Sequence, residues 1–215
     1  MNNFPPLLPG QMYHIYNRGN NRENIFVEPD NYRFFLERYF QFANKFAETY
    51  AYCLLRNHFH LLIGIKENIN NEGKPLRSLE RPYAEHDLKG FKSDEQGEFA
   101  SLQLSNFFNS YSKSFNKMYS RSGSLFTKPF RRKLIENDSY FTQVIAYIHL
   151  NSERHGFVND FREYPYSSYH DILSEVDTKV QRESVLNWFG GKEAFKTFHL
   201  DYRKSRFNEA IIVED

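Results

Sequence analysis

The chain has 215 residues, of which 40% are hydrophobic and 18% aromatic, so it can bury the core of one domain with a small appendage. It has no apolar run long enough for a membrane span and no signal-peptide pattern at its start. It has a single cysteine, Cys53, which excludes an internal disulfide and fits a reducing cytosol. The net charge of +1 by itself says nothing about nucleic acid.

Polar and aromatic residues alternate over Gln11–Arg18 and predict a first strand, which a Gly-Asn-Asn turn ends. Apolar residues at helical spacing then predict an amphipathic helix over about Pro29–Phe46. Two more strands are predicted over Thr49–Leu55 and His58–Ile65. Because so few residues separate them, we expect an antiparallel hairpin, with a loop of two residues or slightly more.

The middle of the chain is polar and charged over residues 66–97, with glycines and prolines and little periodicity. A loop of that length within a compact domain is uncommon, and such loops are often functional or disordered. Helical spacing returns over Phe99–Tyr119, and two short strands are predicted over Gly123–Thr127 and Arg132–Ile135.

The last part of the chain is predicted to be helical. Asn137 is a helix-cap signal before a helix over Tyr140–Leu150, which Gly156 ends. After a turn-rich stretch, two short helices are predicted over Arg182–Phe189 and Glu193–Tyr202, joined at two glycines.

The order of these elements is strand, helix, strand, strand, helix, strand, helix, which is typical of an α+β sandwich. We expect an antiparallel sheet covered by helices on one face. Residues 1–160 are predicted to form the main domain, and residues 161–215 a small helical extension packed on it.

Two histidines, His58 and His60, flank Phe59 in the third predicted strand. Because side chains alternate across a strand, both imidazoles share one face and Phe59 points to the other. They lie about 7 Å apart along the strand and could converge on one metal ion. The alternative is a pair of incidental histidines beside a hydrophobic strand, and a bare His-x-His pattern leaves both open.

The helix predicted over Tyr140–Leu150 adds two groups to this hypothesis. Tyr147 and Asn151 are four residues apart, so phenol and amide project from one helical face. If this helix crosses the face that carries the histidines, Asn151 could supply an oxygen ligand and Tyr147 could reach the same metal. The alternative is an ordinary tyrosine and a C-terminal cap, and among 15 tyrosines residue type alone selects none.

Several motifs occur in the order found in one known protein family. They are Tyr13-His14-Ile15-Tyr16-Asn17-Arg18-Gly19, Arg56-Asn57-His58-Phe59-His60-Leu61-Leu62-Ile63, Gly123-Ser124-Leu125-Phe126, Arg131-Arg132, Tyr147-Ile148-His149-Leu150-Asn151, Arg154-His155-Gly156-Phe157-Val158, Tyr166-Ser167-Ser168-Tyr169 and the segment 186–194. Through them the chain resembles the HUH single-tyrosine transposases over about residues 11–200, and most closely the REP-associated tyrosine transposases.

The resemblance implies a ferredoxin-like antiparallel sheet with helices packed on it, and a transposase-like catalytic domain over residues 1–160. It implies that Tyr147 is the nucleophile, that His58 and His60 are metal ligands, and that Asn151 is the third ligand. The histidines precede the tyrosine, as in transposases and unlike relaxases. Where the family often has Asn-Pro, this chain has Asn151 followed by Ser152, which leaves the helix end open.

The implied reaction is metal-dependent cutting and joining of single-stranded or hairpin DNA. Two neutral imidazoles with an amide or water oxygen suit Mg²⁺ or Mn²⁺. Attack by the tyrosine would leave a 3′-hydroxyl and a 5′-phosphotyrosine, which a later 3′-hydroxyl can reverse. We expect a cytoplasmic, nucleoid-associated protein without a membrane partner, and both monomer and homodimer stay open.

The expected DNA contacts come from basic and aromatic residues. The segment 113–133 carries basic residues and no acidic one, which is typical of a phosphate-binding surface and equally of an ordinary solvated face. The candidates for phosphate contacts are Arg18, Lys128, Arg131 and Arg132. Those for base stacking are Tyr13, Tyr16 and Phe126, although for each of them packing in the core is the more common role.

Two other functions compete with this one. A ferredoxin-like sheet also serves non-catalytic proteins that bind single-stranded nucleic acid, and a transposase relative could be kept for binding alone. A zinc-dependent hydrolase would need a further metal ligand. The sequence offers Cys53, which lies in an apolar strand, and His86, which lies in the polar segment, and both are poor candidates.

Overall fold

The computed structural model describes residues 4–67 and 93–206. These residues contain a four-stranded antiparallel sheet in the spatial order β2-β3-β1-β4. Its strands are β1 (Met12–Arg18), β2 (Ala47–Leu55), β3 (His58–Ile65) and β4 (Arg131–Leu134). Helices α1 (Pro29–Ala43) and α2 (Ser93–Met118) connect them in the order β1-α1-β2-β3-α2-β4, the pattern of a ferredoxin-like fold. The predicted α+β class is therefore confirmed.

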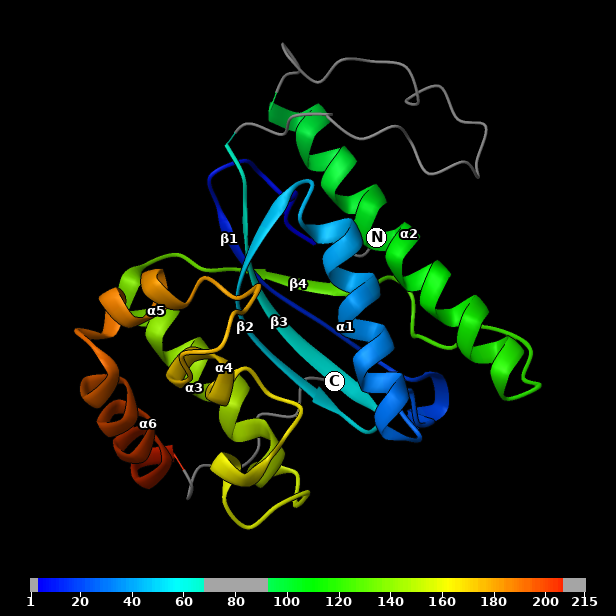
Figure 1. Ribbon diagram of the computed structural model, residues 1–215. Coiled ribbons are helices and arrows are strands. Elements are labelled where there is room, and N and C mark those ends of the chain that lie inside the picture. The colour runs from blue at the N-terminus through cyan, green and yellow to red at the C-terminus, as the bar shows by residue number, and fades with distance from the viewer. Residues whose placement is uncertain (1–3, 68–92, 207–215) are drawn as a thin grey trace.

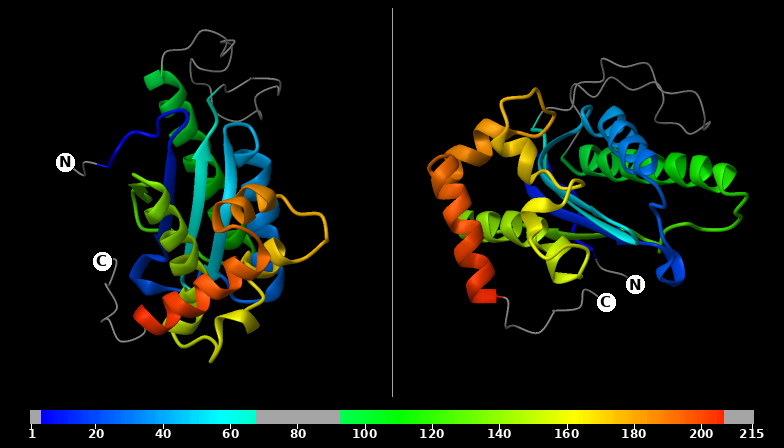
Figure 2. Two further views of the ribbon diagram at one scale, coloured as in Figure 1. Left: turned by 90° about the vertical axis from the view of Figure 1, so that its left-hand side faces the viewer. Right: turned by 60° about the horizontal axis from the view of Figure 1, so that its bottom comes forward.

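Helices cover both faces of the sheet. α1 and α2 lie together on one face, and α3 (Asp138–Arg154) crosses the other, as the two views of Figure 2 and the ribbon of Figure 1 show. The expectation that helices cover one face only was wrong. The reason lies in β3, where every residue after His58 is buried, so that both sides of the strand need an apolar cover.

The core between the sheet and the two helices α1 and α2 is largely aromatic. Phe59 of β3 packs against Phe35 of α1 and Phe108 of α2, with ring centroids 5.1 and 5.5 Å apart. Phe35 also contacts Phe107 edge to face at 4.9 Å. Because burying each such ring contributes about 1.5–3 kcal/mol, this cluster fixes β3 and therefore the two histidines that flank Phe59.

The hairpin between β2 and β3 has a two-residue loop, Arg56 and Asn57, with Leu55 paired to His58. Backbone hydrogen bonds hold the loop in place, since Gly19 N donates to Asn57 O over 2.8 Å. Gly19 is required there, because a Cβ at this position would come within 2.0 Å of the carbonyl oxygen of Glu23. The loop and the turn after β1 are thus fixed together at the end of the sheet where His58 lies.

α3 is longer than predicted. The Asn137 side chain caps it by accepting a hydrogen bond from Tyr140 N over 2.9 Å, as the sequence indicates. The helix continues past Asn151 to Arg154, because Ser152 in place of proline leaves the hydrogen-bonding pattern intact. Gly156, two residues after this end, has a φ of 72° in the left-handed region and stops the helix from continuing.

The strand predicted over Gly123–Thr127 does not form. In this segment Phe126 makes only an isolated bridge to Gly19, and the hydroxyl of Ser124 donates to the carbonyl of Phe126 over 2.7 Å. A local side-chain hydrogen bond of this kind competes with strand pairing. Most of the polar segment 66–97 lies outside the described residues.

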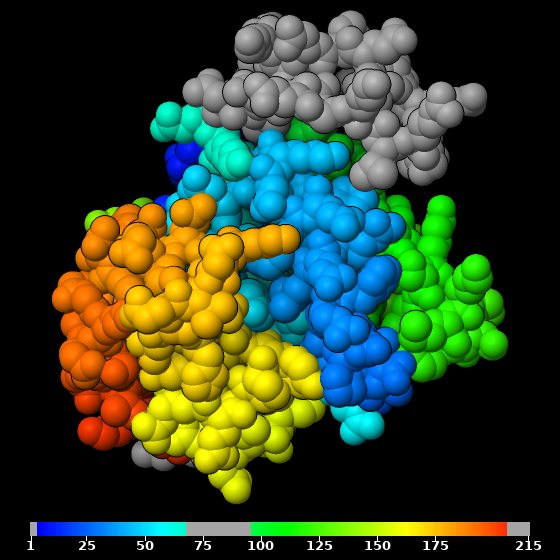
Figure 3. All heavy atoms as spheres, in the orientation of Figure 1, coloured from blue at the N-terminus to red at the C-terminus, as the bar shows by residue number. Residues whose placement is uncertain are grey.

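The C-terminal helices α4 (Tyr169–Leu173), α5 (Arg182–Phe189) and α6 (Lys192–Arg206) lie on the α3 side of the sheet. The segment before α5 pairs with β2, since Gln181 N donates to Thr49 O over 2.8 Å, and in the space-filling view it lies against α1 and β2 (Figure 3). None of the described helices is long and apolar enough to span a membrane.

A chain of buried polar groups joins α6 to α3. The Nδ1–H of His199 donates to the carbonyl of Phe195, which leaves its Nε2 to accept from Nδ1 of His149 over 2.9 Å. Nε2 of His149 in turn lies 2.9 Å from the hydroxyl of Ser168. Nearby, Arg203 of α6 pairs with the buried Glu153 of α3.

Candidate functional site

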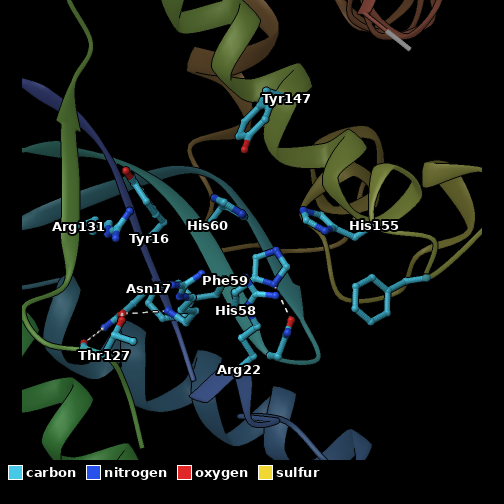
Figure 4. Close-up of a pocket in the computed structure, with 13 residues that line it drawn as sticks. Tyr16, Asn17, Arg22, His58, Phe59, His60, Thr127, Arg131, Tyr147 and His155 are labelled. Carbon is cyan, nitrogen blue, oxygen red and sulfur yellow. Dashed lines mark hydrogen bonds between the residues drawn. The ribbon is translucent and has the colours of Figure 1, made fainter. Parts of the chain in front are cut away.

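A cavity of about 470 Å³ opens on the α3 side of the sheet. Strands β1, β3 and β4 supply its floor, and α3 with the turn that follows supplies one wall (Figure 4). The lining residues are Tyr16, Asn17, Arg18, Arg22, Asn57, His58, Phe59, His60, Thr127, Arg131, Tyr147, His155 and Phe157. The cavity therefore brings together the His-x-His pair, the tyrosine of α3 and three arginines.

The strand register explains why the two histidines face the cavity. His60 is paired with Tyr16 of β1, and His58 with Arg18, so all four side chains share one face of the sheet. The prediction that Phe59 points to the opposite face is confirmed by its packing on α1 and α2. The imidazoles of His58 and His60 are perpendicular, with centroids 5.3 Å apart.

Each of these histidines has its Nδ1 atom in a hydrogen bond. Nδ1 of His58 lies 2.7 Å from the amide oxygen of Asn57, and an oxygen can only accept, so His58 carries its hydrogen on Nδ1. Nδ1 of His60 lies 3.0 Å from Nε2 of His14. In both rings Nδ1 is engaged by a protein partner, so a metal ligand bond would have to use Nε2.

Burial keeps both imidazoles neutral. Desolvation, with smaller contributions from the nearby His155 and Arg18, lowers the pKa of His58 to about 3. Desolvation also lowers the pKa of His60 well below its usual range, with His14 and His58 as the next causes. Neutral imidazole is the form that binds a metal, so the charge state suits this use.

Tyr147 faces the histidines from α3. Its ring makes edge contacts with His60 and His14 at centroid distances of 5.7 and 5.9 Å, and Figure 4 shows its hydroxyl pointing into the cavity. The guanidinium of Arg154 lies over the same ring, 5.6 Å from its centroid. The helix thus presents a phenol oxygen to the cavity, with a cation over the face of its ring.

Asn151 does not line this cavity. It is 1% exposed, and its Nδ2 donates to the backbone carbonyl of Tyr147 over 2.8 Å. The four-residue spacing therefore places the amide against its own helix, instead of beside the phenol as expected. Among the described residues, no group of three or more His, Cys, Asp or Glu is arranged to hold a metal ion.

The alternation of β1 and β4 separates the predicted DNA contacts into two groups. Arg18, Arg131 and Tyr16 line the cavity. Arg132 points to the opposite face, where its Nη1 donates to the hydroxyl of Ser101 over 2.8 Å. Tyr13 is fully buried on that face, and its hydroxyl donates to the carbonyl of Pro6.

Three further predicted residues lie outside the cavity lining. Phe126 is 4% exposed and packs in the core, whereas Lys128 is exposed. For the zinc-hydrolase hypothesis, Cys53 is fully buried on β2 and burial raises the pKa of its thiol, while His86 lies outside the described residues.

Sequence reasoning did not assign several cavity residues to the site, among them His155, Arg22 and Asn57. His155 follows α3 two turns after Tyr147, and its ring lies 4.6 Å from that of His58. Arg22 reaches the cavity from the turn after β1, where its φ of 61° is unusual for a residue other than glycine. Asn57 orients His58 from the hairpin loop. Only the two-turn spacing of His155 is a signal that the sequence contains.

Comparisons with known proteins point to one group. No family model matches the chain. A curated relative in Haemophilus influenzae, named as a REP-associated tyrosine transposase, is 27% identical over 130 residues, which are 60% of this chain and 63% of the relative. The chain thus spans less than two thirds of the length of that relative.

One solved structure shares the fold. It is that of a REP-associated tyrosine transposase bound to a REP hairpin, with a TM-score of 0.55 and 16% identity, and the match covers 81% of this chain and 87% of that one. The curated relative confirms the resemblance to REP-associated tyrosine transposases that the motifs indicate, and the solved structure confirms the fold.

Proposed function

We propose that this protein is a transposase-like enzyme that cuts and rejoins single-stranded or hairpin DNA through Tyr147. The observation that carries the proposal is the position of the Tyr147 hydroxyl, which points into the cavity that the paired histidines line. The similarity to a curated transposase and to a structure bound to a REP hairpin supports the same substrate class.

The charge of the cavity favours a phosphodiester. Arg18, Arg22 and Arg131 line it, and none of the 13 lining residues is acidic. Guanidinium groups bind phosphate oxygens through strong, often bidentate hydrogen bonds. We infer that these arginines hold the backbone of the DNA strand on either side of the bond that is cut.

The size of the cavity favours an unpaired strand. A volume of about 470 Å³ is that of a site for a small molecule. A cavity of this size would take a single nucleotide with its base turned out of the stack. Tyr16 and Phe157, which line the cavity, offer aromatic surfaces for stacking such a base.

The donor set fits a divalent metal, Mg²⁺ or Mn²⁺, held by Nε2 of His58 and Nε2 of His60. Bound there, the metal would withdraw charge from a non-bridging oxygen of the phosphate. The remaining ligands would be oxygens of phosphate and water, which suit these ions. Asn151 could join them only if its amide leaves the carbonyl of Tyr147.

Tyr147 would attack the phosphorus with its phenol oxygen. The new bond joins this oxygen to phosphorus, the bond from phosphorus to the 3′-oxygen breaks, and the proton lost by the phenol is balanced by one gained at the freed 3′-hydroxyl. The guanidinium of Arg154 favours negative charge on the attacking oxygen. The 5′-phosphotyrosine keeps the ester, so a later 3′-hydroxyl can reverse the step and join strands.

A second function, binding of single-stranded DNA without cutting it, is favoured by one observation. The described residues contain no cluster of three or more conventional metal-binding side chains. Incubation with labelled hairpin DNA bearing a single-stranded tail and Mn²⁺, followed by a denaturing gel, separates the two. A covalent DNA adduct supports the enzyme, and binding without any adduct supports the second function.

A further inference from the structure

We propose that His14 is a positioning residue of the metal site, which holds the His60 ring so that its Nε2 faces the metal. This inference rests on the proposed function, because it assigns a role toward the metal that His58 and His60 would bind. His14 lies within the first of the sequence motifs, which gave it no role, and it does not line the cavity.

The geometry places His14 directly behind His60. His14 lies on β1 opposite Leu62, diagonal to His60 on the neighbouring strand and on the same face of the sheet. Its Nε2 is 3.0 Å from Nδ1 of His60, and the two rings stack at a centroid distance of 5.1 Å and an angle of 26°. Both histidines are nearly inaccessible, at 2% and 3% exposure.

The direction of this hydrogen bond follows from the chemistry of a metal ligand. A neutral imidazole has one hydrogen, and a ligand nitrogen must offer its lone pair. A metal on Nε2 of His60 therefore requires the hydrogen on Nδ1, which then donates to Nε2 of His14. Histidine ligands in proteins generally donate their other N–H in this way, and the acceptor fixes the tautomer and the ring orientation.

His58 has the same arrangement with a different acceptor. Its Nδ1–H donates to the amide oxygen of Asn57 over 2.7 Å. The two proposed ligands thus present the same tautomer, and each takes its orientation from a separate partner. This parallel is the second observation that supports a positioning role for His14.

Packing alone does not account for a histidine at this position. A buried polar ring costs free energy unless it is hydrogen-bonded, and an apolar side chain of similar size would fill the same space. His14 also contacts the ring of Tyr147 at 5.9 Å and stacks on Tyr16 at 4.9 Å. It therefore contacts the ring of the proposed nucleophile as well as that of the proposed ligand.

The test is Mn²⁺ binding by the protein without DNA, measured from the electron paramagnetic resonance signal of free Mn²⁺. His14→Leu removes the acceptor and keeps an apolar side chain, whereas His14→Gln keeps an acceptor in its amide oxygen. We expect His14→Leu to weaken Mn²⁺ binding on the order of 10- to 100-fold. His14→Gln should bind Mn²⁺ nearly as the wild type does.

The controls separate failure of this inference from failure of the proposed function. His60→Ala should abolish Mn²⁺ binding, and if the wild type itself binds no Mn²⁺, the proposed metal site fails. If the wild type binds, His60→Ala does not, and His14→Leu binds like the wild type, the positioning role is overturned while the metal site stands. Thermal unfolding of each variant shows whether a loss of Mn²⁺ reflects a loss of fold.

If His14→Leu does not fold, nuclear magnetic resonance of the wild type decides the matter. Correlation of ring protons with ¹⁵N in histidine-labelled protein containing Mg²⁺ reports which nitrogen of His60 carries hydrogen. Hydrogen on Nδ1 agrees with donation to His14, and hydrogen on Nε2 contradicts it.

Discussion

Tyr147 and His60 face each other across the cavity, with ring centroids 5.7 Å apart and the rings nearly perpendicular. Tyr147 lies on α3 and His60 lies on β3. The two residues are far apart in the sequence, and the packing of the helix on the sheet brings them together. The proposed chemistry depends on this pairing, because the phenol must reach a phosphate that the histidine side of the cavity would hold.

The metal hypothesis predicts that His58→Ala abolishes DNA cleavage in Mn²⁺. Because His58 is partly exposed at the cavity edge, this change should alter the free energy of unfolding by only about 1 kcal/mol. His60→Ala should abolish cleavage as well, but at a larger cost in stability of about 1–3 kcal/mol, since it leaves the buried His14 without that hydrogen bond. Cleavage assays and thermal unfolding measure both effects. Cleavage by His58→Ala at the wild-type rate would show that the metal assignment is wrong.

The two neighbouring arginines of β4 make a matched pair of variants. Arg131→Gln should weaken binding of single-stranded DNA and reduce the slope of log K against log salt by about one, because one phosphate contact is lost. Arg132→Gln should leave this slope unchanged and lower stability instead, since Arg132 binds Ser101 on the opposite face. Titrations at several salt concentrations measure the slopes. Equal slopes for Arg131→Gln and the wild type would remove Arg131 from the DNA contacts.

The buried pair His149 and His199 predicts a loss of stability in acid. Burial lowers the pKa of His199 to about 4 from an ordinary 6.5, and it lowers that of His149 well below 6.5. The unfolded chain therefore binds more protons than the folded one, so the stabilisation is complete above pH 6.5 and is lost as the pH falls toward 4. For His199 alone this is on the order of 3 kcal/mol.

His199→Gln isolates this contribution from the other buried histidines. Denaturant unfolding at several pH values should show a smaller loss of stability between pH 6.5 and 4 in the variant than in the wild type. An identical pH dependence in the two proteins would mean that His199 is not buried as a neutral ring.

Periodicity in the sequence predicted most of the sheet and the shared face of His58 and His60. The alternation of side chains is a local property, and β3 forms over the predicted residues. The same alternation did not show that Tyr13 and Arg132 are on the wrong face for DNA, because it does not tell which face of β1 or β4 carries the cavity. That depends on where α3 packs, which is a long-range contact.

The hydrogen-bond partners of His60 and Asn151 could not be predicted for a similar reason. The contact between His14 and His60 depends on the pairing of β1 with β3, which no local pattern contains. For Asn151 the spacing was right, but a hydrogen bond to its own helix took precedence over projection into the cavity. The position in a helix fixes the direction in which a side chain leaves the backbone, but the side-chain rotamer decides which groups its end reaches.

Tyr147→Phe tests the central claim most directly, because it removes one oxygen and keeps the ring and its contacts. The matched control is Tyr140→Phe in the same helix, where the ring lies under Lys133 at 4.9 Å and does not line the cavity. Each protein is incubated with labelled hairpin DNA and Mn²⁺, and the adduct is resolved on a denaturing gel and mapped by mass spectrometry. We predict an adduct on Tyr147 in the wild type and in Tyr140→Phe, and none in Tyr147→Phe, which should still bind DNA. An adduct that persists in Tyr147→Phe, or that maps to another tyrosine, would contradict the account.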